Sequence, residues 1–195
     1  MTPARILIDR IEVMRQGRDK PVLVAVDGWS ASGKSTFAAQ VADQIGAVVI
    51  DGDEFYAGGS PSEWDGMSPA DKAGHCIDWR RQRPVLEALA RGETASWHAY
   101  DWDSHDGSFI ISESSCSPAP VVILEGVYSA RPELADLFDL RVLYSAPAEL
   151  RRRRWIEREG EVYLDEWAWR WSEAETWYFT QVMTPEEFDL VLAAE

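Results

Sequence analysis

The most informative stretch of this sequence is Val22-Leu-Val-Ala-Val-Asp-Gly-Trp-Ser-Ala-Ser-Gly-Lys-Ser-Thr36. Its first five residues are apolar and mostly β-branched, which predicts a strand that is buried on both faces. The spacing G-x-x-x-x-G-K-S follows from Gly28 to Ser35, and the residues from Thr36 to Gln44 favour a helix. A strand, a glycine loop and a helix in this order predict a loop that binds phosphate.

This loop has the chemistry that a nucleoside triphosphate requires. Glycine lets the backbone approach a phosphate closely, and the N-terminus of the following helix carries about half a positive charge. We expect Lys34 to reach the β- and γ-phosphates of ATP and the Ser35 hydroxyl to bind Mg²⁺. Without such a ligand the glycines would be ordinary turn residues and Lys34 a solvated side chain, but the ordered combination disfavours that interpretation. The residues expected to bind the nucleotide are Gly28, Ser30, Ala31, Ser32, Gly33, Lys34, Ser35 and Thr36.

Composition limits the class of protein. The chain has 195 residues, of which 46% are hydrophobic and 27% charged, and its net charge of −15 disfavours a general nucleic-acid-binding surface. Cys76 and Cys116 form no C-x-x-C pair, which disfavours a zinc site or a disulfide framework. No stretch resembles a signal peptide or approaches the ~20 apolar residues of a membrane span. We therefore expect one cytoplasmic domain, 1–195, without nucleic-acid or membrane partners, and leave a homo-oligomer open.

Four further apolar stretches predict strands. They are Ala47–Ile50, Val121–Gly126, Leu140–Tyr144 and Asp189–Ala193. Helical patterns lie between strands or flank them, as at Pro3–Gln16 and at Ile77–Arg91, where Pro84 either kinks the helix or starts its second half. Strands that alternate with helices indicate a parallel sheet covered on both faces, and thus a three-layer α/β fold.

Three carboxylates follow the predicted strands, at the edge where open α/β sheets bind their ligands. Asp51 and Asp53 come after the second strand, and Glu125 ends the third. Such a group accepts the proton of a substrate hydroxyl or holds Mg²⁺ through water. Because aspartate is also common as a turn cap, the two interpretations are balanced for Asp51, whereas function is favoured for Asp53. For Glu125 a place beside Mg²⁺ is favoured over a solvent-facing strand end.

The segments between the second and third strands have a different character. Residues 57–75 are rich in Gly, Ser, Pro and Asp, which predicts a long loop, either a lid or disordered. Alternating residues at Thr94–Trp102, followed by Ser108–Ile111, predict a β-hairpin, and Ser112–Pro120 is expected to be a linker. We expect 57–75 and 94–119 to be insertions on the side where a second substrate binds.

A cluster of arginines is unusual in so acidic a chain. Arg151, Arg154 and Arg158 recur at helical spacing on one face of the helix predicted at 147–159. Such a face can neutralise charge on a transferring phosphoryl group. The alternative, a solvated face paired with glutamates, is favoured for Arg152 and Arg153. We expect 147–181 to form a lid and a C-terminal helical region, in which core packing is the favoured role of Trp167, Trp169, Trp171 and Trp177.

Together these motifs resemble the uridine kinase-like branch of P-loop kinases, which includes uridine/cytidine kinases, phosphoribulokinase and bacterial pantothenate kinase. The matching segments cover most of the chain and follow the family's order. They are Asp27–Thr36, Asp53-Glu-Phe-Tyr56, Tyr100-Asp-Trp-Asp-Ser-His105, Leu124–Val127, Arg151–Arg158 and Asp189–Leu192. The P-loop is common to many NTPases, whereas the second and third segments are far more specific. The resemblance implies a five-stranded parallel sheet with the strand order 2-3-1-4-5.

The resemblance also implies roles for individual residues. Asp53 matches the carboxylate that activates the acceptor hydroxyl, and Glu125 matches the acid associated with Mg²⁺. Tyr100 and His105 match positions that contact the nucleoside base, and Tyr56 matches a neighbouring aromatic residue. The lid arginines of the family match Arg151, Arg154 and Arg158.

The chain departs from uridine kinases at two places. These enzymes carry Asn-Phe-Asp-His-Pro before a helix, and its aspartate holds the ribose. Here the region reads Pro69-Ala-Asp-Lys-Ala-Gly-His75, so that Asp71 is a shifted candidate. The tip after His105 is Asp106-Gly107 rather than basic. Both departures weaken the match to uridine as the acceptor, whereas the residues expected to carry out phosphoryl transfer are unaffected.

The expected activity is transfer of the γ-phosphoryl group of ATP to a hydroxyl of a small metabolite, with a uridine- or cytidine-like nucleoside as the first candidate. The expected catalytic residues are Asp53, Lys34, Arg154 and Arg158. The expected acceptor-binding residues are Asp53, Tyr56, Asp71, Tyr100, His105 and Arg151, and Ser35 and Glu125 are the expected Mg²⁺ residues. Two alternatives stay open. One is a kinase for a sugar, a pantothenate-like alcohol or an antibiotic, and the other is a non-enzymatic nucleotide-binding regulator, which would not require the acceptor-side residues.

Overall fold

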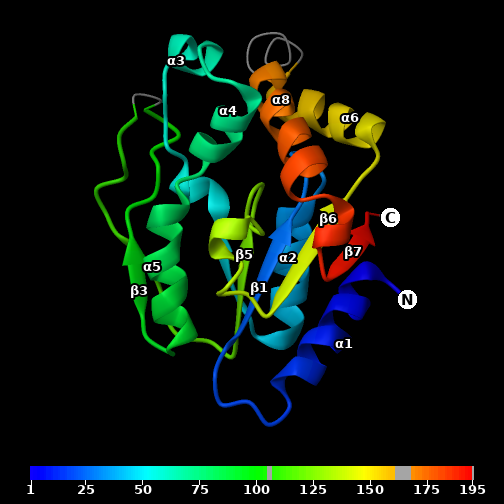
Figure 1. Ribbon diagram of the computed structural model, residues 1–195. Helices are drawn as coiled ribbons and strands as arrows, with labels where there is room; N and C mark the ends of the chain where they lie inside the picture. The colour runs from blue at the N-terminus through cyan, green and yellow to red at the C-terminus, as the bar shows by residue number, and fades with distance from the viewer. Residues whose placement is uncertain (105–106, 161–167, 195) are drawn as a thin grey trace.

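The computed structural model describes residues 1–104, 107–160 and 168–194. A five-stranded parallel sheet forms its centre, and Figure 1 shows helices on both sides of it. Along the sheet the strands are β2 (Val48–Asp51), β5 (Val121–Glu125), β1 (Val22–Asp27), β6 (Leu140–Ser145) and β7 (Leu190–Ala193). Numbered along the chain, these five strands follow the order 2-3-1-4-5, so that the predicted α/β fold and its strand order are confirmed.

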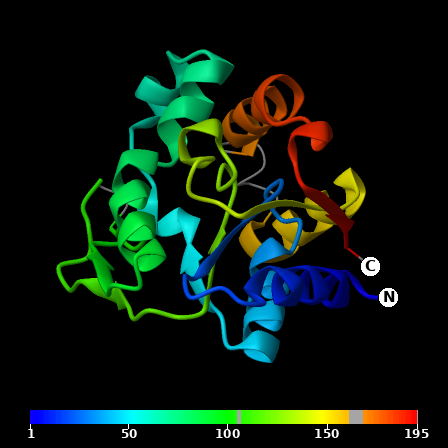
Figure 2. The ribbon, with the colours of Figure 1, turned by 60° about the horizontal axis from the view of Figure 1, so that its bottom comes forward.

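The central strand β1 has a hydrophobic core on each face. The outer layers include α1 (Pro3–Arg15), α2 (Lys34–Ile45) and α5 (Trp79–Ala90). All six residues of β1 are buried, and successive side chains of a strand point to opposite faces. Val22, Val24 and Val26 pack in the core beneath α1 and α2. Leu23 and Ala25 pack in the core beneath α5. Figure 2 shows α1 and α2 together on one side of the sheet, with α5 on the other.

Two short helices occupy the segment 57–75, and the expectation of a long loop there is wrong. They are α3 (Pro61–Asp65) and α4 (Pro69–Cys76). Each begins with a serine cap followed by proline, and Ser60 forms a reciprocal capping box with Glu63. Serine at the cap and proline in the first turn favour the start of a helix, although the same residue types also favour loops. Composition alone therefore did not reveal these helices.

The helix expected at Ile77–Arg91 is present as α5 and runs without interruption through Pro84. It begins after Asp78, whose carboxylate accepts the backbone N–H of Arg80 at 3.1 Å. Proline removes one hydrogen bond from the second turn. The helix continues because its inner face is anchored in the core by Gln82, Val85, Leu86 and Leu89.

The predicted β-hairpin has a different second strand. The strand β3 (Ala95–Trp97) pairs antiparallel with β4 (Ser114–Cys116), so that part of the expected linker is a strand. The expected partner segment, Ser108–Ile111, also pairs with the end of the predicted strand, but it forms no strand of its own. It makes a bridge between Phe109 and Tyr100, and backbone hydrogen bonds run from Asp101 to Ser108 and from Ile110 to Ala99. An alternating pattern identifies a strand but does not specify which later segment pairs with it.

The C-terminal helices lie over the carboxyl end of the sheet. They are α6 (Ala148–Glu159), α8 (Trp169–Trp177) and the π-helical turn η4 (Tyr178–Val182), while Trp167 lies outside the described residues. Two ion pairs join α8 to α3 and α4: Arg170 contacts Asp65, and Lys72 contacts Glu173, each at 2.6 Å. In Figure 1, α3, α4 and α8 stand together at the top.

The described residues also form three 3₁₀ turns, η1 (Gly52–Phe55), η2 (Pro132–Leu134) and η5 (Pro185–Glu187). Among the residues described, no helix is both long and apolar enough to cross a membrane.

Candidate active site

The loop after β1 has the backbone of a phosphate-binding loop. Gly28 has a φ of 156°, and a Cβ at this position would lie 2.2 Å from the carbonyl oxygen of Tyr144. Gly33 has a φ of 92° and precedes α2, which places Lys34 and Ser35 in the first turn of that helix. The first N–H groups of a helix have no partner within it, so they are available to an anion. The parts of the P-loop thus lie where the sequence predicted them.

A buried carboxylate holds this loop to two other elements. Asp27 is fully buried and accepts the N–H groups of Gly28 at 2.7 Å and of Tyr128 and Ala130 at 3.0 Å each. The hydroxyl of Tyr178 donates a fourth hydrogen bond at 2.8 Å. Burial raises the pKa of Asp27 to about 6, against the opposing effect of these hydrogen bonds. Asp27 therefore ties the P-loop to the segment after β5 and to η4.

Strand pairing brings the predicted carboxylates together. In the register of β2 with β5, Asp51 is opposite Glu125. Burial raises the pKa of Glu125 to about 7, and the charge of Lys34 and a hydrogen bond from Ser35 oppose this rise. The Oε2 atom of Glu125 is buried and has no hydrogen-bond partner among the described atoms. An orphaned carboxylate oxygen next to a P-loop serine fits Mg²⁺, which prefers oxygen ligands.

Asp51 combines the two interpretations that the sequence left balanced. Its carboxylate accepts the N–H of Asp53 at 2.8 Å and so caps η1, yet it also lines a cavity together with Asp53. Burial, and next the charge of Asp53, raises the pKa of Asp51 to about 6. The cap fixes the backbone of Asp53 at the edge of the sheet.

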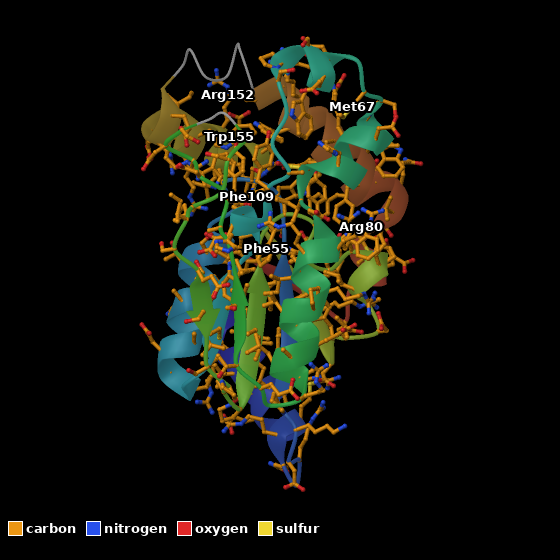
Figure 3. The ribbon with its side chains drawn as sticks, turned by 90° about the vertical axis from the view of Figure 1, so that its left-hand side faces the viewer. Phe55, Met67, Arg80, Phe109, Arg152 and Trp155 are labelled. Atoms are coloured by element: carbon orange, nitrogen blue, oxygen red, sulfur yellow. The ribbon has the colours of Figure 1, made fainter. Side chains whose placement is uncertain are left out.

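Two adjoining cavities open beside these carboxylates. The first has a volume of about 390 Å³ and extends from Ser30 of the P-loop past Asp53. The second, of about 990 Å³, extends under α3 and α4. We call the two cavities together the aromatic cleft, because they share Tyr56, Trp102, Glu159 and Trp171. Figure 3 shows Trp155 and Met67, which line the first and the second cavity, on opposite sides of the upper half of the molecule, above Phe55.

Tyr56 is the centre of the aromatic wall. Its ring stacks on Trp102 with centroids 4.8 Å apart and planes at 18°. Tyr100 and Trp171 meet it edge-on at 4.8 and 5.5 Å. Tyr56 and Tyr100 were predicted here, whereas Trp102 was not, although its place two residues after Tyr100 could have indicated it. The assignment of Trp171 to core packing is incomplete, because this residue lines both cavities.

The three arginines predicted to share a face make different contacts. Arg154 donates from Nη1 to the carbonyl oxygens of Ser32 at 2.6 Å and Ala31 at 3.3 Å. The guanidinium of Arg151 lies 4.7 Å from the ring centroid of Trp29. Two of the predicted arginines therefore hold the P-loop from outside. The third, Arg158, lines the first cavity, while the exposed Arg153 pairs with Glu157 as the solvated-face interpretation expects.

The role of Glu175 in α8 was not predicted from the sequence. This carboxylate is 3% exposed and accepts both the N–H of Ser30, at 3.0 Å, and its hydroxyl, at 2.5 Å. Burial raises the pKa of Glu175, and the two hydrogen bonds from Ser30 oppose the rise. Ser30, predicted to bind the nucleotide, thus has its backbone N–H paired with a side chain of the protein.

One predicted acceptor residue, Asp71, does not line the cleft. Asp71 lies in the first turn of α4, where its carboxylate accepts the hydroxyl of Ser68 at 2.6 Å, and it lines neither cavity. Its helix-capping contact turns it to the surface, so the shifted match to the ribose-holding aspartate is not supported. His105 lies outside the described residues.

Comparisons with known proteins agree with this geometry. The family described as "Phosphoribulokinase / Uridine kinase family" matches residues 23–161. The uridine kinase of Deinococcus deserti is 28% identical to the chain, over 74% of this chain and 72% of its own length. The uridine kinase of Ligilactobacillus salivarius is 26% identical, over 76% of this chain and 71% of its own length.

Solved structures share the fold. A candidate fructose transport system kinase from Silicibacter sp. TM1040 superposes with a TM-score of 0.72 at 22% identity over 98% of both chains. A D-glycerate 3-kinase from Cryptococcus neoformans superposes with a TM-score of 0.65 at 12% identity, over 97% of this chain and 94% of its own. Since the family match spans well over half of the sequence, the chain belongs to the phosphoribulokinase/uridine kinase family.

Proposed function

We propose that this kinase transfers the γ-phosphoryl group of ATP to a hydroxyl of a small acceptor bound in the aromatic cleft, with a nucleoside as the first candidate. The observation that carries the proposal is the first cavity, which Asp53 and Ser30 of the P-loop line together. A catalytic carboxylate and a phosphate-binding loop that border one cavity are the arrangement that in-line transfer to an alcohol requires.

The P-loop holds the triphosphate in this proposal. The first-turn amides of α2 and the ammonium of Lys34 bind its phosphate oxygens, and Ser35 and Glu125 hold Mg²⁺. When bound, the metal ion neutralises charge on the phosphates. The orphaned Oε2 of Glu125 supports this assignment.

Asp53 accepts the proton of the acceptor hydroxyl. The hydroxyl oxygen then bonds to the γ-phosphorus while the bond from that phosphorus to the bridging oxygen breaks and ADP leaves. Arg158 from the cleft side and Arg154 from the P-loop side neutralise the charge that develops. The acceptor-side insertions 57–75 and 94–119 supply the walls that exclude water from this step.

The aromatic wall supports a flat acceptor. The exposed Trp102 stacks on the buried Tyr56 and offers its outer ring face to a nucleobase, and Tyr100 packs edge-on against both rings. Relatives named uridine kinase favour the same class. The position of Asp71 outside the cleft favours a second candidate, a kinase for a non-nucleoside alcohol, because no match to the ribose-holding aspartate remains among the described cleft residues.

ADP release tests the proposal. Purified protein with ATP and Mg²⁺ is offered nucleosides, sugars and other small alcohols, and we expect acceptor-dependent ADP formation with at least one of them. Asp53→Asn is expected to lower kcat by about 100-fold or more, since general-base catalysis contributes about 10²–10⁴-fold, with little change in ATP affinity. Wild-type turnover by Asp53→Asn would show that the base is assigned wrongly. ATP binding without turnover on any acceptor would favour a nucleotide-binding regulator.

A further inference from the structure

Charge is divided between the two ends of the proposed active site. At the P-loop end, Lys34 is buried in the first turn of α2, and Arg151 and Arg154 contact the loop. In the aromatic cleft the described lining residues include one guanidinium and one imidazole, those of Arg158 and His75. The same lining contains five carboxylates, those of Asp51, Asp53, Glu63, Glu159 and Glu175.

Most of these carboxylates have neutral hydrogen-bond partners. Glu63 accepts hydrogen bonds from Ser60, and Glu175 accepts them from Ser30. Glu159 is the exception, because Arg158 donates to it at 2.6 Å. The cleft therefore carries an excess of negative charge close to its walls. Since like charges repel strongly where water is partly excluded, an acceptor with a carboxylate or a phosphate would be disfavoured here.

The walls between these carboxylates are aromatic faces. Trp102 lies stacked on Tyr56, and Trp171 packs edge-on against the same ring. Aromatic faces attract cations by about 0.5–2 kcal/mol, and more strongly than neutral groups of the same shape. Aromatic rings combined with nearby carboxylates are the chemistry that recognises a cationic nitrogen.

The first cavity is also bordered by the buried side chain of Tyr128. Tyr128 is 2% exposed and lines this cavity, and its Oη atom has no hydrogen-bond partner among the described atoms. A buried polar group that forms no hydrogen bond destabilises the folded protein, because it has lost its contacts with water. The φ of Tyr128 is +69°, an unfavourable conformation for a bulky residue and one that is found at functional sites. These observations point to a polar ligand at this end of the cleft.

We propose that the acceptor is a hydroxyl compound that carries a positive charge, as a protonated amine or as a cationic ring nitrogen. The charged group lies between the aromatic faces and the carboxylates of the cleft, and Tyr128 hydrogen-bonds a polar group of the same molecule. This inference rests on the proposed function, which makes the cleft the acceptor site, and it narrows the class of acceptor.

Matched probes test the charge preference by binding, independently of turnover. Isothermal titration of the protein with Mg²⁺ and a non-hydrolysable ATP analogue compares 3-methylcytidine, a cation near neutral pH, with neutral 3-methyluridine and cytidine. A second series compares glucosamine, glucose and glucuronate. In the series that binds, we expect the cation to bind about 2- to 30-fold more tightly than its neutral counterpart, from the cation–π range. A neutral or anionic probe that binds as tightly as the cation, or failure of both cations to bind, would overturn the inference.

Two variants on α6 test whether the preference for a cationic acceptor arises from the carboxylates of the cleft. Glu159→Gln removes one negative charge from both cavities and frees Arg158, so we expect the advantage of the cation to fall severalfold while the neutral probe binds as before. Glu157→Gln is the matched control, because Glu157 is exposed on the same helix, pairs with Arg153 and lines neither cavity of the cleft. An equal loss in both variants would assign the effect to the net charge of the protein and would overturn the inference.

The same probes distinguish a failure of this inference from a failure of the proposed kinase function. Selective binding of a cation without ADP release from any probe contradicts the proposed kinase activity but supports the charge preference of the cleft. ADP release that is fastest with a neutral or anionic acceptor supports the kinase and contradicts the charge preference.

Discussion

Removing the hydroxyl of Tyr178 tests the role of the buried carboxylate behind the P-loop. In Tyr178→Phe, Asp27 loses the donor that lies 2.8 Å from its Oδ2 atom and keeps its three backbone donors. A hydrogen bond to a charged group contributes about 1.5–3 kcal/mol. For a chain of 195 residues, each kcal/mol shifts Tm by roughly 2–4 °C. We therefore expect Tm to fall by about 3–12 °C.

The neighbouring Tyr128 gives a matched control. Its ring packs edge-on against Tyr178 with centroids 4.8 Å apart, both side chains are buried, and its hydroxyl has no partner among the described atoms. Tyr128→Phe removes the same atom without breaking a hydrogen bond. We expect its stability in the absence of ligand to equal or exceed that of the unchanged protein, because a desolvated hydroxyl is lost.

Urea unfolding followed by circular dichroism measures both variants. Near pH 7.5 Asp27 is mostly ionised, and the full difference is expected. Below its pKa of about 6 the carboxyl is protonated in the folded protein, so the loss in Tyr178→Phe should shrink toward the ~0.5–1.5 kcal/mol of a neutral hydrogen bond. Equal unfolding free energies for the two variants near pH 7.5 would refute the assignment of Asp27 as the anchor of the loop.

Three further predictions concern the same loop. Lys34→Ala is expected to impair both ATP binding and ADP release, and a fully active variant would remove the P-loop assignment. Arg154→Ala is expected to raise the KM for ATP by about tenfold, because the variant loses two hydrogen bonds to the loop. The control is Arg152→Ala, which changes an exposed residue of the same helix and should alter the KM for ATP by less than about twofold. Equal effects of the two substitutions would contradict the role of Arg154. Asp27 binds its proton more tightly in the folded protein, where its pKa is about 6, than in the unfolded chain, where its pKa is near 3.8. Protonation of this group therefore stabilises the fold by about 3 kcal/mol below pH 3.8, and this contribution is lost as the pH rises through 6. Asp27→Asn should remove that part of the pH dependence of urea unfolding, and an unchanged slope would contradict it.

Local signals were sufficient to predict most of the fold. The strands β1 and β5 are runs of apolar residues because both of their faces are buried, and such runs are visible in the sequence. The P-loop depends on backbone conformations that glycine favours, and Gly28 shows this requirement directly through its close approach to Tyr144. The positions of the carboxylates Asp53 and Glu125 were predictable, because Glu125 ends β5 and Asp53 lies two residues after the end of β2.

The parts that escaped prediction depend on contacts between distant segments. Glu175 binds Ser30 across 145 residues, and Tyr178 binds Asp27 across 151. Neither pairing leaves a periodic or local pattern. Trp171 was assigned to core packing because an indole ring in a helix has the same pattern whether it faces a core or a cleft. The helices α3 and α4 were missed for a different reason, since serine and proline serve both as helix starts and as loop residues.

Helix α8 joins the two halves of the site energetically. Arg170 and Glu173 pair with Asp65 and Lys72 of the α3–α4 segment, and within two turns of the same helix Glu175 binds the P-loop. Lys72 is 2% exposed, and a buried charge that loses its partner costs several kcal/mol, so α3 and α4 cannot separate from α8 cheaply. We therefore expect movement of these helices toward or away from the sheet to shift Glu175 relative to the loop. Since Glu175 is buried and would leave its donors at a cost, we expect the width of the aromatic cleft and the conformation of the P-loop to be coupled through this helix.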